Sequence, residues 1–236
     1  MESMPLIYLL PMIVLGSLAG FWALICFAGA MPVLCLHKAQ LASLPEAEAR
    51  DVLQRVLTEG PVPPAWAGEQ GFEPTGAYRV LNLPGEPIMV VWSHRAERTY
   101  LVVYLLPDGG LSCDMVTVLL KEPGEEDDGG ITTGSRSDGL LFPNRATSWM
   151  QCFSTPSAVE QWKRHEEAVQ YLQQSRGRRT DPQPGDVVAD FTDAIANQGR
   201  FIRSIPLWWL RIPYWYFVRK NRRFNKPVSE LDRLDS

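Results

Sequence analysis

The chain has 236 residues, of which 45% are hydrophobic and 21% are charged, and its formal net charge is −4. This length suits one ordinary domain with membrane attachments and excludes two large domains. The charges are unevenly placed, because residues 200–226 hold eight basic side chains and no acidic one. Subtracting these eight from the 23 basic residues leaves 15 against 27 acidic residues in the rest of the chain. An acidic body with a basic segment predicts contact with an anionic surface.

The first 36 residues predict a membrane anchor. After a short N-terminus (residues 1–4), residues 5–36 contain no charged side chain, and a helix needs only about 20 such residues to cross a bilayer. A cleaved signal peptide is the alternative, since Ala28-Gly29-Ala30 offers a small-residue cleavage pattern. The apolar run is longer than a signal peptide needs, and no basic residue precedes it. We therefore expect an uncleaved transmembrane helix over residues 5–36.

The flanks of this helix predict its orientation. Glu2 is the only charged side chain on the N-terminal side, whereas His37 and Lys38 follow the helix directly. The positive-inside tendency then places the N-terminus outside and the soluble domain in the cytoplasm. The basic segment would there face the anionic leaflet of the bilayer.

Small residues on one side of the predicted helix indicate a packing face. Gly16 and Gly20 form a GxxxG motif, which Ala23 extends. Such a face allows close contact with a second copy of the chain or with other membrane-protein subunits. A chance occurrence in a Gly- and Ala-rich helix is the alternative.

The region after the anchor predicts an α+β domain. Ser43 and Glu46 match a capping box, which predicts a juxtamembrane helix over 43–60 leading from the membrane to a soluble domain over 61–175. Apolar runs separated by turn signals then predict an antiparallel meander. Its strands are Tyr78–Leu83, Ile88–Trp92, Tyr100–Leu106 and Leu111–Leu120, with a further short strand near Leu140.

A long helix closes the predicted domain. It spans Ala158–Gln174, with Val159, Trp162 and Leu172 on its core face and His165 on its polar side. A meander covered by helices on one face is an α+β layer architecture.

No motif predicts a reaction, a cofactor or a metal. His37, His94 and His165 are isolated and are predicted to be surface side chains, and Ser135 lacks the spacing of a nucleophile elbow. The acidic run at residues 122–130 lacks the ligand spacing of a calcium loop and is predicted to be solvated and mobile. Cys113 and Cys152 match no zinc pattern. A disulfide between them stays open for an exported domain.

The C-terminal region predicts a second membrane contact. A linker with a short amphipathic helix (residues 176–199) leads to an aromatic, basic segment (residues 200–227) and a tail (residues 228–236). The apolar centre of that segment, Ile205–Val218, contains Arg211 and two prolines, and as a helix it would reach only about 21 Å, too short to span a bilayer. We expect it to lie in the interface. Its predicted contact residues are Trp208, Trp209, Arg211, Tyr214, Trp215, Tyr216, Arg219, Lys220, Arg222 and Arg223.

Packing of these aromatics onto another protein is the alternative, and nucleic acid is not expected because the body is acidic. Together these features predict a membrane-anchored, non-catalytic accessory or scaffold subunit of a larger membrane complex. The alternatives are a membrane-tethered ligand-binding or sensing domain, and an enzyme whose site the sequence does not reveal.

Overall fold

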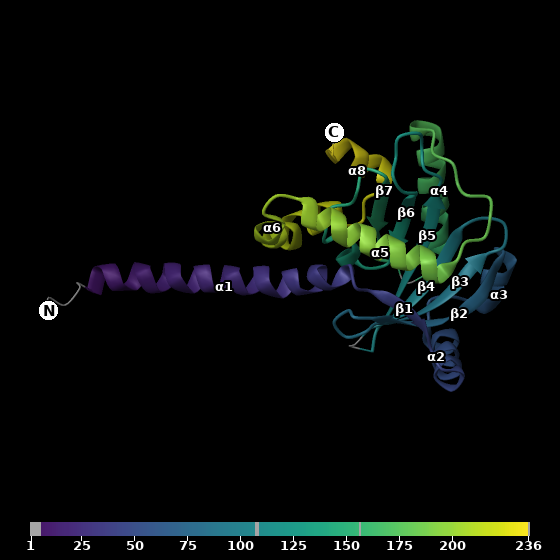
Figure 1. The fold of residues 1–236 in the computed structure, drawn as a ribbon, viewed down its shortest axis with the longest axis horizontal. Helices are drawn as coiled ribbons and strands as arrows, with labels where there is room; N and C mark the ends of the chain where they lie inside the picture. The colour runs from purple at the N-terminus through teal and green to yellow at the C-terminus, as the bar shows by residue number, and fades with distance from the viewer. Residues whose placement is uncertain (1–5, 107–108, 156, 236) are drawn as a thin grey trace.

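A seven-stranded sheet forms the centre of the protein, whose computed structural model describes residues 6–106, 109–155 and 157–235 (Figure 1). The strands lie side by side in chain order, from β1 to β7. Each pairs with the next in antiparallel fashion, except that β6 and β7 are parallel. Their bounds are β1 (Gln40–Ser43), β2 (Phe72–Leu81), β3 (Ile88–His94), β4 (Thr99–Leu105), β5 (Leu111–Leu119), β6 (Gly129–Gly134) and β7 (Ser148–Cys152).

The α+β prediction is confirmed, and the predicted meander corresponds to β2–β5. The sheet is larger than predicted, because β1, β6 and β7 extend it at both edges. Leu140 lies in the 3-10 helix η1 (Ser137–Leu140) and not in a strand, which corrects that part of the prediction. The segment containing η1 carries the chain back across the sheet, as a parallel pair requires.

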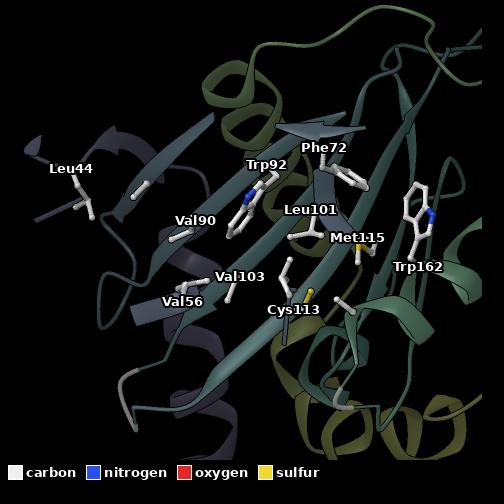
Figure 2. Close-up of a cluster of buried hydrophobic side chains, with 14 residues drawn as sticks. Leu44, Val56, Phe72, Val90, Trp92, Leu101, Val103, Cys113, Met115 and Trp162 are labelled. Atoms are coloured by element: carbon white, nitrogen blue, oxygen red, sulfur yellow. The ribbon is translucent and has the colours of Figure 1, made fainter. Parts of the chain in front are cut away.

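Helices cover both faces of the sheet. On one face lie α2 (Glu46–Glu59), α3 (Pro64–Glu69) and α4 (Ala158–Arg176), and α5 (Val187–Ser204) lies on the other. Figure 2 shows Trp92, Leu101 and Met115 in the core between the sheet and helices α2, α3 and α4. Alternate residues of the same strands pack under Val187 and Phe191 of α5. Because both faces are covered, the central strands are continuous apolar runs.

Helix α4 presents a more polar face to the sheet than its apolar residues predict. Its buried residues include Gln161, Trp162 and His165, whereas Val159 is 44% exposed. The prediction of Val159 in the core and His165 at the surface is therefore wrong. His165 Nε2 lies 2.8 Å from Thr117 Oγ1, and its Nδ1 lies 2.9 Å from Thr133 Oγ1. These hydroxyls are hydrogen-bond partners for both ring nitrogens, so the buried imidazole is not left unpaired.

The connection from the first helix to the domain also differs from the prediction. Helix α1 (Leu6–Leu36) leads directly into β1, where Ser43 pairs with Tyr78 of β2. Helix α2 begins only at Glu46, and its N-cap is Pro45 without a side-chain hydrogen bond. The predicted capping box at Ser43 is therefore absent, because sheet pairing holds that residue in a strand.

The predicted linker belongs to the domain. The backbone N–H of Leu120 donates to the Arg179 carbonyl at 2.9 Å, so the chain after α4 is bonded to the end of β5. Asp186 then caps α5 by accepting hydrogen bonds from the N–H groups of Val188 and Ala189. Helix α5 has 18 residues and ends at Ser204, which makes it longer than the short helix that was predicted.

Arginines pair with acids of the run at residues 122–130, which the prediction of a solvated, mobile loop did not include, although Glu126 and Asp127 are exposed as that prediction expects. Glu125 accepts a hydrogen bond of 2.7 Å from Arg178, and this guanidinium lowers the pKa of the Glu125 carboxyl to about 2. Asp127 lies 3.1 Å from Arg145. The sequence did not predict these pairs, because the arginines lie far along the chain.

A partly buried ion pair fastens α5 to the sheet. Arg98, which immediately precedes β4, donates from Nε to Asp190 Oδ2 of α5 at 2.8 Å, and the Tyr100 hydroxyl donates to the same carboxylate. Asp128 and Asp181 accept from Arg98 Nη1 at 2.9 and 3.3 Å. The hydrogen bond to Asp190 raises the pKa of Arg98, and burial beside Asp190 raises that of Tyr100. Arg98 is therefore shared by three carboxylates from different segments.

Replacing Asp190 tests this attachment. The Asp190→Ala variant leaves Arg98 and Tyr100 without their main partner, and we expect it to lower the free energy of unfolding by about 3 kcal/mol. Thermal unfolding followed by circular dichroism in a non-ionic detergent measures the change. Asp193→Ala, an exposed acid of the same helix, is the matched control. Equal stability of the two variants would contradict the role assigned to the Arg98–Asp190 pair.

Candidate functional site

Helix α1 extends away from the rest of the protein (Figure 1). Its segment from Leu10 to Leu36 has 27 residues, a mean hydropathy of 2.1 and 6% of its most apolar window buried. By length and composition it is able to cross a membrane. Most of its large apolar side chains contact no other part of the domain, and Leu10, Leu15 and Phe27 are each more than 60% exposed.

The C-terminal end of α1 packs into the domain. Val33 of α1, Ile202 of α5 and Ile212 of α6 (Trp208–Tyr214) are buried in one apolar cluster. Glycines allow the close approach, because a Cβ added at Gly29 would lie 2.4 Å from Ile212 Cγ2 and one added at Gly199 would lie 2.7 Å from Leu36 Cβ. The C-terminal end of α1 and the domain are thus one packed unit.

The predicted packing face of α1 is not the part of the helix that contacts the domain. Gly16, Gly20 and Ala23 are exposed, and a Cβ added at either glycine would meet no atom within 4 Å. The helix contacts within the chain instead involve Gly29, which sequence reasoning missed. Its signal was the small-residue run around Gly29, which also resembles a signal-peptide cleavage site.

The chain turns sharply between α5 and α6 and then exposes a band of apolar side chains. Pro206 ends the helical hydrogen bonding, and Leu207 adopts a left-handed conformation with φ of 53°. Helix α6 contacts the C-terminal part of α1 and continues into the π-helix η2 (Trp215–Arg219). We call the exposed apolar residues of this region the apolar collar: Leu207, Trp209, Leu210, Tyr214, Tyr216 and Phe217.

The structure divides the predicted interface residues between the surface and the interior. Trp209, Arg211, Tyr214, Tyr216 and Arg222 are exposed. Trp208 is partly buried and Trp215 is buried, both in the cluster with α1.

Most of the basic residues at the end of η2 and just after it contact other parts of the domain. Arg219 donates from Nη1 to the carbonyls of Leu140 and Phe142 at 2.6 and 2.9 Å, and the Trp215 ring packs edge-on against Phe142. Lys220 begins helix α7 (Lys220–Arg223), and its Nζ lies 3.5 Å from Asp138 Oδ1. Arg223 of the same helix is buried. Four basic residues of this region, Arg219, Lys220, Arg222 and Arg223, were predicted to contact the membrane surface. All except Arg222 are thus part of the folded domain. The tail continues as α8 (Val228–Asp235), which packs on α4 and β7.

A groove of about 610 Å³ lies on the α5 side of the sheet. Strands β5–β7 form its floor, α5 forms one wall, and the segment from Asp138 to Arg145 lines the other side. The floor is hollow where β6 presents Gly130 and Thr132 to this face, opposite Val118 and Val116 of β5. Glycine and threonine leave space that larger strand residues would fill. The groove is within the size range of small-molecule sites.

Asp114 lies on the floor of this groove. It pairs with Val102 of β4 and Gly134 of β6, so it occupies the middle of the sheet. Burial raises the pKa of the Asp114 carboxyl to about 7, although the N–H of Ser135 donates to the carboxylate and opposes the shift. A carboxyl with a strongly raised pKa in a concave site is a candidate functional group. The sequence offered no signal for it, because Asp114 is one acid within an apolar run.

The residues considered for chemistry do not assemble around Asp114. Burial lowers the pKa of His165 to about 3, and this residue lies on the opposite face of the sheet in its threonine network. Ser135 donates no proton to a base and instead accepts a hydrogen bond from the Cys113 N–H at 2.9 Å. Cys113 and Cys152 are buried free thiols, which leaves the alternative of a disulfide unformed. Within the described residues, no group of three His, Cys, Asp or Glu side chains is placed to hold a metal ion.

Comparisons with models of protein families, with curated proteins and with solved structures find no match for this chain. The collar and the groove are therefore the two features from which a function is inferred.

The pKa of Asp114 predicts how stability depends on pH. Because the folded-state pKa of about 7 lies above the ordinary value, the folded state binds this proton more tightly than the unfolded state. Stability is therefore lost as the pH rises from about 4 to about 7. Asp114→Asn removes this loss, and we expect it to raise the melting temperature at pH 8 by about 3 °C and to leave it nearly unchanged at pH 4. Asp51→Asn, at an exposed position of α2, should change neither. A lower melting temperature for Asp114→Asn at pH 8 would contradict the prediction.

Proposed function

We propose that this protein is a membrane-anchored, non-catalytic accessory or scaffold subunit, whose α+β domain is held against the face of the bilayer. Helix α1 would cross the membrane with its N-terminus outside, which places the domain on the cytoplasmic side. The observation that carries the proposal is the apolar collar, which is exposed on the part of the domain that packs against α1.

The collar and the anchor support each other. The core helix of a soluble protein would be mostly buried. In α1, only 6% of the most apolar window is buried. Trp and Tyr side chains prefer the headgroup region of a bilayer, and Trp209, Tyr214 and Tyr216 lie in the collar. Because α6 packs on α1, crossing of the membrane by α1 would bring the collar to the headgroup level. The exposed Arg211 and Arg222 would add attraction to anionic lipids.

A spin label in the collar tests this contact in the full chain. We expect a nitroxide on Phe217→Cys, reconstituted in liposomes with anionic lipid, to be more accessible to oxygen than to a water-soluble nickel complex, because it would lie among lipids. A label on Asp51→Cys, on the other side of the sheet, should show the reverse. Preferential access of the nickel complex to position 217 would contradict contact between the collar and the bilayer.

The subunit role depends on the free surface of α1. Gly16 and Gly20 leave a flat strip with no intrachain contact, and such strips allow helices to approach closely in a membrane. A partner helix, from a second copy or from another membrane protein, would cover this strip.

Native mass spectrometry after gentle detergent extraction measures this association. We expect the wild type to be recovered with bound partners, and the double variant Gly16→Val with Gly20→Val to be recovered mainly as a monomer, because branched side chains would separate the helices. Leu18→Val, on the opposite side of α1, is the matched control and should keep the partners. Recovery of the wild type only as a monomer would contradict the subunit role.

A second candidate function is that of a membrane-tethered ligand-binding or sensing domain. The groove favours this ligand-binding function, because its volume of about 610 Å³ is combined with an apolar lining and convergent polar groups. Asp114 supports the same role, since a carboxyl that costs stability in the middle of a sheet is expected where a ligand uses it.

A further inference from the structure

We propose that the groove binds an organic ammonium compound with an apolar body, whose cationic group lies against Asp114. This inference deepens the second candidate function and rests on the groove being a ligand site. It follows from three observations: the apolar lining, the excess of acidic groups, and the position of the groove beside the end of α1.

The lining of the groove fits an apolar body. Val116 and Val118 of β5 form part of the floor, and Phe142, Trp149 and Ile195 come from the surrounding segments. An apolar compound that displaces water from such a surface gains about 25 cal/mol for each Å² buried.

The charges of the groove favour a cation over an anion. Seven acidic residues line it, namely Asp114, Glu126, Asp127, Asp128, Asp138, Asp190 and Asp193, against the three basic residues Arg98, Lys121 and Arg145. Arg98 and Arg145 are already paired with acids of this group, and Lys121 is exposed. An anionic ligand would therefore meet a net negative surface, whereas a cation would be attracted.

Asp114 is the acid best placed to bind the cation. Asp127 is paired with Arg145, Asp128 and Asp190 share Arg98, and Asp138 lies near Lys220. Asp114 forms no ion pair with any of the described residues, and it lies on the floor among apolar side chains. An ammonium group beside it would supply the missing counter-charge in a site of low dielectric, where such a pair is strong. A metal ion is a poorer fit, because the described residues place no three ligands together.

The groove also lies where an amphiphile would reach it. Pro32 and Leu36, at the C-terminal end of α1, line the same cavity as Asp114. If α1 crosses the bilayer, this side of the groove lies near the membrane surface. Compounds with an apolar body and a positive charge concentrate at an anionic membrane surface.

Isothermal titration of the full chain in a non-ionic sugar detergent tests the inference. The probes are hexyltrimethylammonium, hexyl sulfate and hexanol, which share a chain and differ in charge, together with Mg²⁺ and Ca²⁺. We expect hexyltrimethylammonium to bind with at least tenfold higher affinity than the other four. Asp114→Asn should lower its affinity about tenfold, whereas Asp51→Asn, at an exposed acid far from the groove, should not change it.

A second variant locates the binding without removing a charge. A Cβ added at Gly130 would lie 3.5 Å from its nearest neighbour, the Thr117 carbonyl oxygen, so Gly130→Leu fills the groove with little strain on the strand. We expect this variant to abolish binding while keeping the circular dichroism spectrum of the wild type.

The outcomes separate the two levels of the inference. Equal binding of hexyl sulfate or hexanol, blocked by Gly130→Leu, would overturn the assignment of a cation and leave the ligand-binding role intact. Ammonium binding that neither Asp114→Asn nor Gly130→Leu weakens would show attraction to the acidic surface only, and would overturn the assignment of the site. Binding of none of the organic probes would contradict both this inference and the ligand-binding role of the groove.

Discussion

The attachment of α5 to the sheet is the constraint on which both candidate sites depend. Arg98 and Asp190 join the helix to the sheet, and Phe191 beside Asp190 packs into the core that lies beneath it. Further along α5, Gly199 and Ile202 meet α1. One helix therefore positions α1 relative to the sheet and forms a wall of the groove. A charge pair suits this task, because it fixes a direction that apolar packing alone leaves adjustable.

His165 on the α4 face and Asp114 on the α5 face have different polar surroundings. Under α4, the hydroxyls of Thr117 and Thr133 satisfy His165, and Gln161 donates to the carbonyls of Cys113 and Thr133, so these two buried side chains have hydrogen-bond partners. On the α5 face, Asp114 has a backbone N–H but no counter-charge among the described residues. A paired buried network stabilises a fold, whereas an unpaired buried carboxyl costs free energy. This contrast is why the groove, and not the histidine, is the candidate site.

Sequence reasoning succeeded where a short stretch carries its own physical signal. The runs Ile88–Trp92 and Tyr100–Leu106 were assigned to strands because they are short apolar runs bounded by turn signals. Helices were expected on one face only, whereas they cover both faces of the sheet, where central strands are apolar throughout. Sequence reasoning missed β6, because Gly129, Gly130 and Gly134 have low strand propensity, and one of them, Gly130, lies on the floor of the groove. The burial of His165 was also beyond it, since its partners come from other strands. In each case the deciding contact joins residues distant in the chain.

The sequence by itself determined that an apolar helix long enough to cross a membrane begins the chain, where the structure describes Leu6–Leu36, that an α+β domain follows, and that aromatic and basic residues concentrate between residues 200 and 227. Uninterrupted hydrophobicity and strand periodicity are local properties, so no partner is needed to establish them. The tertiary structure decided which of those aromatics are exposed: Trp215 is buried against Phe142, whereas Trp209 remains in the apolar collar. It also turned Arg219 inward to the carbonyls of a distant loop. A side chain's role as core or surface depends on what packs against it, and only the folded chain supplies that neighbour.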